Sequence, residues 1–181
     1  MQKKIIAIVG GPSTGKTTLI NNLISKGFCC YPEISREIIL EAQKEGIEQL
    51  FLEQPLLFSE LLIKGRKKQF KEAQKEHSQI VFIDRGLPDV LGYLHYANQK
   101  YPDSYRTICQ ENRYSDVFIL PPWSEIHVTD QARYESFEQS QIIHQHILQT
   151  YKDLNYSPIE VPKDGVESRI QFILNNLKKE P

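Results

Sequence analysis

The sequence predicts an α/β protein in three layers, with a parallel β-sheet covered by helices on both faces. Two observations lead to this fold class. Short β-prone runs alternate along the chain with longer stretches of helical periodicity. Several of these runs are apolar throughout, which is typical of parallel strands that are buried on both faces. The expected strands are residues 5–9, 28–31, 80–83, 117–120 and 158–161.

Helical stretches are expected between these strands. Apolar residues at helical spacing follow the first strand and end at Gly27, and a similar stripe runs from Val166 to Leu177. Asp164 and Glu167 stand at capping-box spacing at the start of the second stripe. Residues 34–79 exceed the length of a simple crossover, so we expect at least two helices there, over residues 34–45 and 56–76, as a substrate-covering insertion. Residues 124–152 are expected to form a lid, in which residues 130–152 are one helix or a helical hairpin.

The composition describes one ordinary globular domain, residues 1–181. The chain is 40% hydrophobic and 25% charged, and its formal net charge of −1 does not attract it to nucleic acid or to an anionic membrane. Three cysteines, two of them adjacent, argue against a disulfide framework, and no apolar run approaches the ~20 residues of a membrane span. We therefore expect a cytoplasmic protein that binds neither nucleic acid nor membrane.

The sequence GGPSTGKT at residues 10–17 matches the phosphate-binding pattern G-x-x-x-x-G-K-[ST] in full. In such a loop the glycines let backbone N–H groups turn toward phosphate oxygens, and the following helix points its positive end at the same anion. Lys16, expected to be partly exposed, would place its charge on the outer phosphates, and the Thr17 hydroxyl would bind Mg²⁺. The alternative is a chance match, on the order of one in a hundred or less. We assign ATP contact to Gly10, Gly11, Pro12, Ser13, Thr14, Gly15, Lys16, Thr17 and Thr18.

The third expected strand ends in Asp84 and Arg85. Ligands of parallel sheets collect at the carboxyl ends of the strands, so a carboxylate there can hold Mg²⁺ and an arginine there can reach a phosphate. The alternative is a surface turn with a salt bridge. Asp116 precedes the fourth strand instead of ending it, and we therefore expect it at the opposite edge, as a turn residue.

Glu33 and Arg36 follow the second strand. A carboxylate at this place can face the γ-phosphate across the cleft and accept a proton from an acceptor hydroxyl, which would make Glu33 the catalytic base. Arg36 is three residues further on and is expected to share a helix face with Glu33. The alternative is an acid that is stabilised by the dipole at a helix N-terminus.

A charged segment over residues 130–138 contains Arg133. An arginine on a mobile helix can cover the phosphates and stabilise the charge that develops during transfer, so Arg133 is our candidate for an internal arginine finger, oriented by Glu135 or Glu138. The alternative is a solvated helix face, the usual meaning of such a run of charges.

Three further features carry less weight. The basic run from Lys64 to Lys75, which includes Arg66, is interrupted by acids at helical spacing and favours a solvated helix face. His144 and His146 are two residues apart and do not share a helix face, which argues against a metal pair. Trp123 follows the fourth strand, where it either stacks on a base or packs against the lid.

Together these motifs resemble the predicted-ATPase family related to the ribosylnicotinamide kinase domain of bacterial NAD-biosynthesis regulators. GGPSTGKT, the Glu33–Arg36 pair, VFIDRG, LPPW, a D-x-x-R-x-E segment and the closing strand and helix occur here in that family's order, over essentially the whole chain. The resemblance implies a P-loop fold like that of nucleoside and nucleotide kinases, with five parallel strands in the order 2-3-1-4-5. It also implies a base role for Glu33, a magnesium role for Asp84, acceptor or phosphate contact for Arg85, a lid role for Arg133, and a loop at residues 161–165 beside the nucleotide base.

The resemblance indicates that the protein is a kinase, but it does not identify the substrate. Unlike in those regulators, no accompanying adenylyltransferase or DNA-binding domain is expected, and residues 46–58 show no pattern for nicotinamide riboside. We expect ATP- and Mg²⁺-dependent phosphoryl transfer to a small-molecule hydroxyl of a nucleoside or nucleotide. The rivals are a regulatory NTPase with slow hydrolysis, which would use the basic run as its partner surface, and a plain NTPase. ATP is favoured because no NKxD-type guanine motif is present; the acceptor and the oligomeric state stay open.

Overall fold

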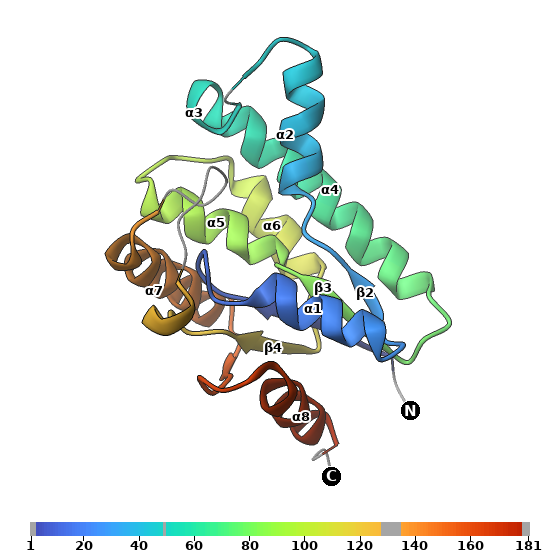
Figure 1. The fold of residues 1–181 in the computed structure, drawn as a ribbon. Helices are drawn as coiled ribbons and strands as arrows, with labels where there is room; N and C mark the ends of the chain where they lie inside the picture. The colour runs from blue at the N-terminus through green and yellow to red at the C-terminus, as the bar shows by residue number, and fades with distance from the viewer. Residues whose placement is uncertain (1–2, 49, 128–134, 179–181) are drawn as a thin grey trace.

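The computed structural model describes residues 3–48, 50–127 and 135–178 (Figure 1). Within them, five parallel strands form one sheet in the order β2-β3-β1-β4-β5, which confirms the predicted fold class and strand order. Each strand lies within one residue of its predicted range. Their bounds are β1 Lys4–Val9, β2 Cys29–Tyr31, β3 Ile80–Asp84, β4 Asp116–Ile119 and β5 Ile159–Glu160.

The register of the sheet brings two of the predicted motifs together. Strand β1 is central, and Ile8 of β1 is paired with Asp84, the last residue of β3. On the other side Val9 is paired with Ile119 of β4. The phosphate-binding loop leaves β1 directly after Val9, so it begins beside Asp84 at the carboxyl edge of the sheet.

Alternating residues of β1 face two separate cores, because successive side chains of a strand point to opposite faces. Ile6 and Ile8 pack with residues of α1 (Lys16–Ser25) and α8 (Val166–Leu177). Ile5, Ala7 and Val9 pack with residues of α4 (Pro55–Lys75) and α7 (Phe137–Asp153). All five of these side chains are buried, so the strand that carries the loop is rigidly held.

The remaining helices extend one side of the molecule. Helices α2 (Ser35–Lys44) and α3 (Leu50–Glu53) project away from the sheet beside the first half of α4 (Figure 1). Helices α5 (Leu87–Tyr96) and α6 (Asp103–Glu111) share a third core with α4, while η1 (Ser124–Ile126) follows β4. The helices predicted over residues 34–45 and 56–76 are therefore present, and their role as a substrate-covering insertion stays a proposal.

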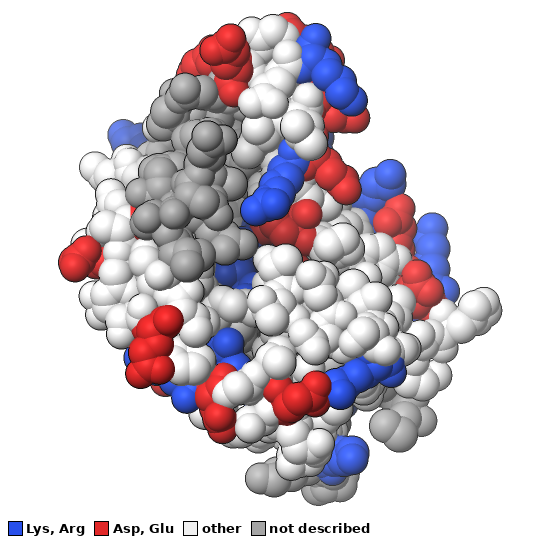
Figure 2. All heavy atoms as spheres, viewed as in Figure 1, with Lys and Arg blue, Asp and Glu red and all other residues white. Residues whose placement is uncertain are grey.

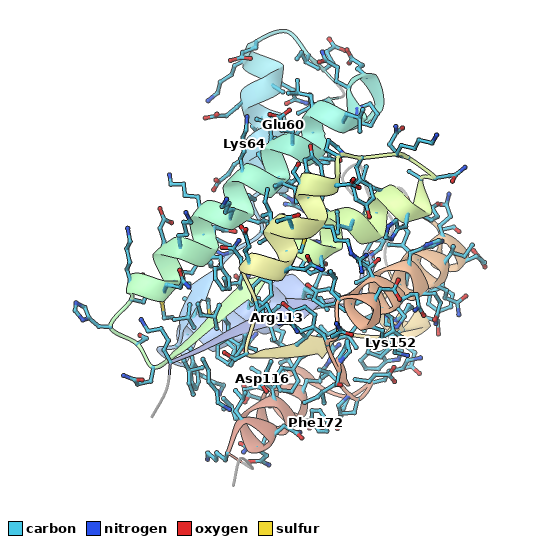
Figure 3. The ribbon with its side chains drawn as sticks, turned by 180° about the vertical axis from the view of Figure 1, so that it is seen from behind. Glu60, Lys64, Arg113, Asp116, Lys152 and Phe172 are labelled. Atoms are coloured by element: carbon cyan, nitrogen blue, oxygen red, sulfur yellow. The ribbon has the colours of Figure 1, made fainter. Side chains whose placement is uncertain are left out.

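The back of the molecule bears an exposed ion pair on α4 and the amino end of β4 (Figure 3). On α4 the Lys64 ammonium lies 2.6 Å from the Glu60 carboxylate, one turn away. Asp116 is the first residue of β4, not a turn residue, and pairs with Lys4 at 3.7 Å. It thus lies at the edge opposite the phosphate-binding loop, as expected. None of the described helices combines the length and apolar character needed to cross a lipid bilayer.

Candidate active site

The loop between β1 and α1 has the backbone of an anion site. Gly10 and Gly15 have φ angles of 141° and 84°, which side chains rarely tolerate. A Cβ on Gly10 would lie 2.5 Å from the Leu120 carbonyl oxygen, and one on Gly15 would lie 2.8 Å from Arg169 Nη1. Helix α1 begins at Lys16 with no side-chain cap, so its first N–H groups stay available for phosphate oxygens.

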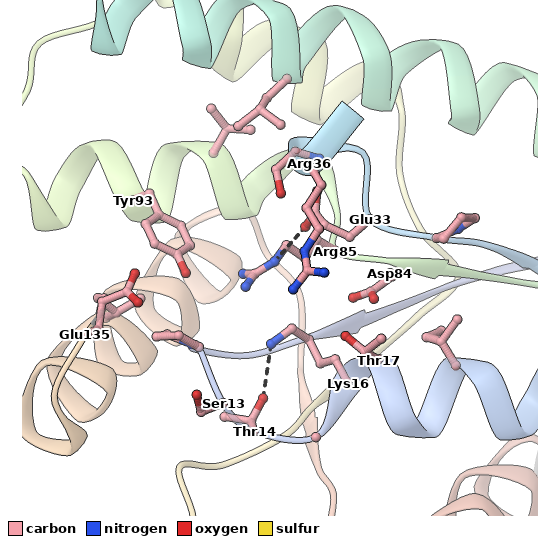
Figure 4. A pocket seen from close by; sticks show the side chains of 18 of the residues that line it. Ser13, Thr14, Lys16, Thr17, Glu33, Arg36, Asp84, Arg85, Tyr93 and Glu135 are labelled. Carbon is pink, nitrogen blue, oxygen red and sulfur yellow. Dashed lines mark hydrogen bonds and ion pairs between the residues drawn. The ribbon is translucent and has the colours of Figure 1, made fainter. Parts of the chain in front are cut away.

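Lys16 is buried rather than partly exposed, which corrects the expectation from sequence. Its Nζ donates to the Gly11 carbonyl at 2.6 Å and to Thr14 Oγ1 at 3.1 Å, so the ammonium is held inside its own loop (Figure 4). Burial, and then the charge of Arg85, lower the pKa of Lys16. The charges of Asp84, Asp89 and Glu33 act in the opposite direction, and an anion bound in the loop would add to them.

Asp84 and Thr17 lie close to Lys16 at the mouth of the loop (Figure 4). Asp84 is 3% exposed, and its Oδ1 has no hydrogen-bond partner among the described residues. Burial raises the pKa of Asp84, against the opposing charges of Lys16 and Arg85. Thr17 is exposed. An orphaned carboxylate oxygen beside an accessible hydroxyl fits Mg²⁺, which takes one or two protein oxygens and completes its shell with phosphate and water.

Glu33 is bound by two arginines from other elements. Its Oε2 lies 2.7 Å from Arg85 Nε, and Arg66 Nη2 donates to both carboxylate oxygens at 3.0 and 3.1 Å. Burial alone would raise the pKa of Glu33, but the Arg66 and Arg85 guanidinium groups outweigh it and hold the pKa below its usual range. Arg36, which was expected to share a helix face with Glu33, is exposed and lines the same cavity.

Glu33 also lies directly before the N-terminus of helix α2, which starts at Ser35 after its N-cap residue Ile34. Its Oε1 accepts the backbone N–H groups of Ile34 and Ser35 at 2.9 and 3.0 Å, which is the alternative that we gave for this acid. The contact fixes the position of the carboxylate and is compatible with a second contact from a ligand. The base role of Glu33 stays a prediction.

Arg85 joins Glu33 to the phosphate-binding loop. Its φ angle is 66°, an unfavourable region for an arginine that marks a constrained turn. From there Nη1 donates to the Gly10 carbonyl at 3.2 Å and lies 3.6 Å from Asp89 Oδ1, while the guanidinium sits 5.4 Å from the centre of the Tyr93 ring. The side chain is thereby held across the cleft, where contact with a phosphate stays its predicted role.

Sequence reasoning missed two buried arginines. Arg66 was assigned to a solvated face but is 3% exposed, and the signal was its place in an apolar register with Leu62 and Phe70, four residues apart. Arg169 of α8 is 4% exposed and donates to the Thr14 carbonyl at 3.0 Å. It lies in line with Val166 and Ile173 on the buried stripe of its helix, which is the comparable signal.

One cavity of about 960 Å³ is lined by the charged groups described above together with Thr17: Lys16, Glu33, Arg66, Asp84, Arg85 and Arg169. It is large enough for a nucleotide and a second small molecule. Figure 2 shows charged atoms of both signs gathered in a hollow of the surface beneath α2. At one end it is lined by the phosphate-binding loop together with Asp164, Gly165 and Arg169, the region that the resemblance places beside the base. Helices α2, α4 and α5 line another part of the cavity mainly with apolar and aromatic side chains, beside the polar Arg36, Ser59 and Arg66; these side chains are Ile39, Phe58, Leu62, Val90, Tyr93 and Tyr96.

The lid is described only in part, because Arg133 lies outside the described residues. Glu135, one of its two expected partners, lines the cavity, whereas Glu138 is exposed. Helix α7 begins in a capping box formed by Ser136 and Gln139. Ser140 Oγ then donates to the Pro12 carbonyl at 2.9 Å, so α7 is attached to the phosphate-binding loop. Trp123 is half-buried at the cavity, and its two interpretations stay open.

Within the described ranges, no group of three or more His, Cys, Asp or Glu side chains is placed to hold a metal ion.

The sheet order and the loop define a P-loop protein with the three-layer fold of nucleoside and nucleotide kinases. The chain belongs to the family described as an AAA domain, whose model matches residues 5–169. This confirms the P-loop family resemblance that the sequence motifs indicated. Comparison with curated proteins gave no match.

Several solved structures share the fold at low sequence identity. Deoxyadenosine kinase from M. mycoides, with products dCMP and dCDP, is 18% identical with a TM-score of 0.71, over 97% of this chain and 100% of that one. NadR protein in complex with NR is 18% identical with a TM-score of 0.74; 97% of this chain matches half of that longer one. Thymidylate kinase from Candida albicans is 16% identical with a TM-score of 0.66, over 98% and 92% of the two chains.

Proposed function

We propose that this protein transfers the γ-phosphoryl group of ATP to a hydroxyl of a small molecule, a nucleoside or nucleotide, with Mg²⁺ as cofactor. One observation carries the proposal. Glu33 and the phosphate-binding loop line a single cavity, which continues beyond Glu33 into an apolar and aromatic chamber. A site that only hydrolyses ATP has no need of such a chamber, whereas the ring of an acceptor fits one.

The donor nucleotide would lie at the loop end of the cavity. Backbone N–H groups of the loop and of the start of α1 bind the phosphates, and Lys16 exchanges its contacts within the loop for the outer phosphates. Thr17 and Asp84 would hold Mg²⁺, which neutralises phosphate charge when it is bound. Arg169 and the loop before α8 border the base. ATP is our candidate donor.

The acceptor would lie in the chamber with its hydroxyl against Glu33. In the reaction, a bond forms between the acceptor oxygen and the γ-phosphorus, the bond to the β-phosphate oxygen breaks, and the hydroxyl proton passes to the Glu33 carboxylate. The lowered pKa keeps Glu33 ionised near neutral pH, so it is ready to accept that hydrogen bond. Phosphoryl transfer depends mainly on the position of the reacting groups and on charge neutralisation. A carboxylate of low basicity therefore suffices as the catalytic base.

Arg85 and Arg133 complete the proposed machinery. Arg85 already spans from Gly10 to Glu33, which places a guanidinium between the donor and acceptor ends. Arg133 would arrive from the lid and stabilise the transferring group. We place this enzyme in the cytoplasm, with small molecules and neither nucleic acid nor membrane as its partners.

Turnover of MgATP with and without a panel of common nucleosides and their monophosphates tests the proposal, with Lys16→Met as the inactive control. Stimulation of ADP release by at least one compound, with a phosphorylated product, is the expected result. Slow hydrolysis that no compound accelerates would contradict it and favour the regulatory NTPase.

A further inference from the structure

Arg66 is a buried cation outside the motifs that define the site. It projects from the middle of α4 and is 3% exposed, so its charge must be compensated by protein groups. Nη2 donates to both oxygens of Glu33, at 3.0 and 3.1 Å, and Nη1 donates to the Gly86 carbonyl at 3.0 Å. One guanidinium therefore bridges the segment after β2 to the turn after β3.

We propose that Arg66 is the positioning residue for Glu33, and that it fixes which carboxylate oxygen meets the acceptor. The inference rests on the proposed function, in which Glu33 receives the acceptor hydroxyl. Because Gly86 follows Asp84 and Arg85 directly, the same guanidinium also sets the spacing between the acceptor side and the phosphate side of the cavity. Arginine suits this task, since its planar fork makes two directed contacts at once.

The contacts of the two Glu33 oxygens identify the one that faces the acceptor. Oε1 receives three donors, from Arg66 and from the N–H groups of Ile34 and Ser35. Oε2 receives two, from Arg66 and Arg85. These five contacts already exceed the roughly four acceptor positions of a carboxylate, so an acceptor hydroxyl would share or replace one of them. Oε2 has fewer donors and none of them is a backbone group, so it is the oxygen that can exchange a contact for the hydroxyl. Arg66 contacts both oxygens and thereby prevents their exchange.

The charged and titratable groups around Glu33 come from several elements. Of these, Arg66 and Arg85 contact the carboxylate directly, and their charges hold its pKa below the usual range in spite of burial. Removing Arg66 would leave Arg85 as the remaining direct cation and would allow the carboxylate to turn. The further charged or titratable groups that face Glu33 are Lys16 on α1, Arg36 on α2, Asp84 at the end of β3 and Tyr93 on α5.

Three variants on α4 separate positioning from a structural role. Arg66→Met keeps the length of the buried stem and removes the guanidinium. Arg66→Lys keeps one charge but loses the fork that reaches Glu33 and Gly86 together. Lys68→Met is the matched control, because Lys68 lies on the exposed face of the same helix, 3.9 Å from Glu72. Glu33→Gln assigns the Glu33 signal in carboxyl ¹³C NMR spectra.

The first readout is the pH midpoint of the Glu33 carboxyl signal in ligand-free, metal-free protein. We expect the midpoint to rise in Arg66→Met, to stay near the wild-type value in Arg66→Lys, and to be unchanged in Lys68→Met. The second readout is steady-state turnover of MgATP with the nucleosides and monophosphates above. Both Arg66 variants should lower kcat, on the order of 10- to 100-fold, with KM for ATP little changed, because a small displacement of the base costs this much.

Two results would overturn the inference. A folded Arg66→Met protein with the wild-type Glu33 midpoint would show that Arg66 does not act on this carboxylate. If Arg66→Met fails to fold, wild-type kcat in Arg66→Lys would show that the fork is dispensable. The NMR result does not depend on turnover, so a shifted midpoint in a protein that phosphorylates none of the compounds would reject the proposed function while supporting the contact.

Discussion

The substitution Tyr151→Phe removes one buried hydroxyl from α7. It tests whether this hydroxyl stabilises the buried carboxylate of Asp89, which lies behind the site. Tyr151 is fully buried, and its hydroxyl donates to Asp89 Oδ2 at 2.7 Å. Asp89 is also fully buried; the same oxygen accepts the Gly86 N–H at 3.0 Å, and Oδ1 lies 3.6 Å from Arg85 Nη1. Burial, and then the charge of Asp89, raise the pKa of Tyr151, so its hydroxyl stays a proton donor. Tyr151→Phe keeps the ring and deletes this donor.

The size of the effect follows from the charge of the acceptor. A hydrogen bond to a charged group contributes roughly 1.5–3 kcal/mol. Asp89 keeps its bond to Gly86, so we expect a loss near the middle of that range, about 2 kcal/mol. For a protein of this length, each kcal/mol corresponds to roughly 2–4 °C in Tm, which predicts a decrease of about 4–8 °C.

Tyr156→Phe is the matched control for this prediction. Its hydroxyl accepts the neutral backbone N–H of Tyr114 at 3.1 Å, so its removal should cost about 1 kcal/mol. Thermal and urea unfolding of both variants, with Asp89→Asn to complete a double-mutant cycle with Tyr151→Phe, measure the difference. The reasoning is refuted if Tyr151→Phe is no more destabilising than Tyr156→Phe.

Three further predictions address the nucleotide site, and a fourth addresses the pH dependence of stability. Lys16→Met should weaken ATP binding in calorimetry roughly 10- to 100-fold at nearly unchanged Tm, because it keeps the buried stem and removes a charged donor; wild-type affinity would remove Lys16 from the site. Asp84→Asn should raise the Mg²⁺ concentration needed for half-maximal turnover more than it weakens ATP binding, and equal activity at low Mg²⁺ would exclude Asp84 as a ligand. Arg133→Ala should lower kcat on the order of 10²-fold with little change in KM. A lowered Tm at unchanged kcat would instead favour the alternative interpretation, in which Arg133 belongs to a solvated helix face. Burial, and then the charges of Lys16 and Lys163, lower the pKa of His144 to about 4 from 6.5. Between these pH values His144 is protonated in the unfolded chain but neutral in the folded protein. The free energy of unfolding of the wild type should therefore fall relative to that of His144→Gln as the pH decreases from 6.5 toward 4. The same pH dependence of the free energy of unfolding in both proteins would contradict the prediction.

The strands and the phosphate-binding loop could be predicted from the sequence because their signals are local. A run such as residues 80–83 is apolar in every position because a central parallel strand is covered on both faces. Gly10 and Gly15 adopt backbone angles that other residues avoid, so the presence of glycine at these two positions is itself a sequence signal for the loop. The position of Asp84 at the end of a strand likewise predicted its edge of the sheet.

The partners of the charged residues were decided only by the tertiary structure. Glu33 lines the cavity, and its ion-pair partners are Arg66 and Arg85, whereas Arg36, its neighbour in sequence, is exposed. Arg66 lies 33 residues from Glu33 in sequence. The helical pattern places such a residue on a face of its helix, whereas its partner depends on how α4 packs beside β2 and β3. Long-range ion pairs form across elements whose spacing is set by packing, and a single sequence does not encode that spacing in any local signal.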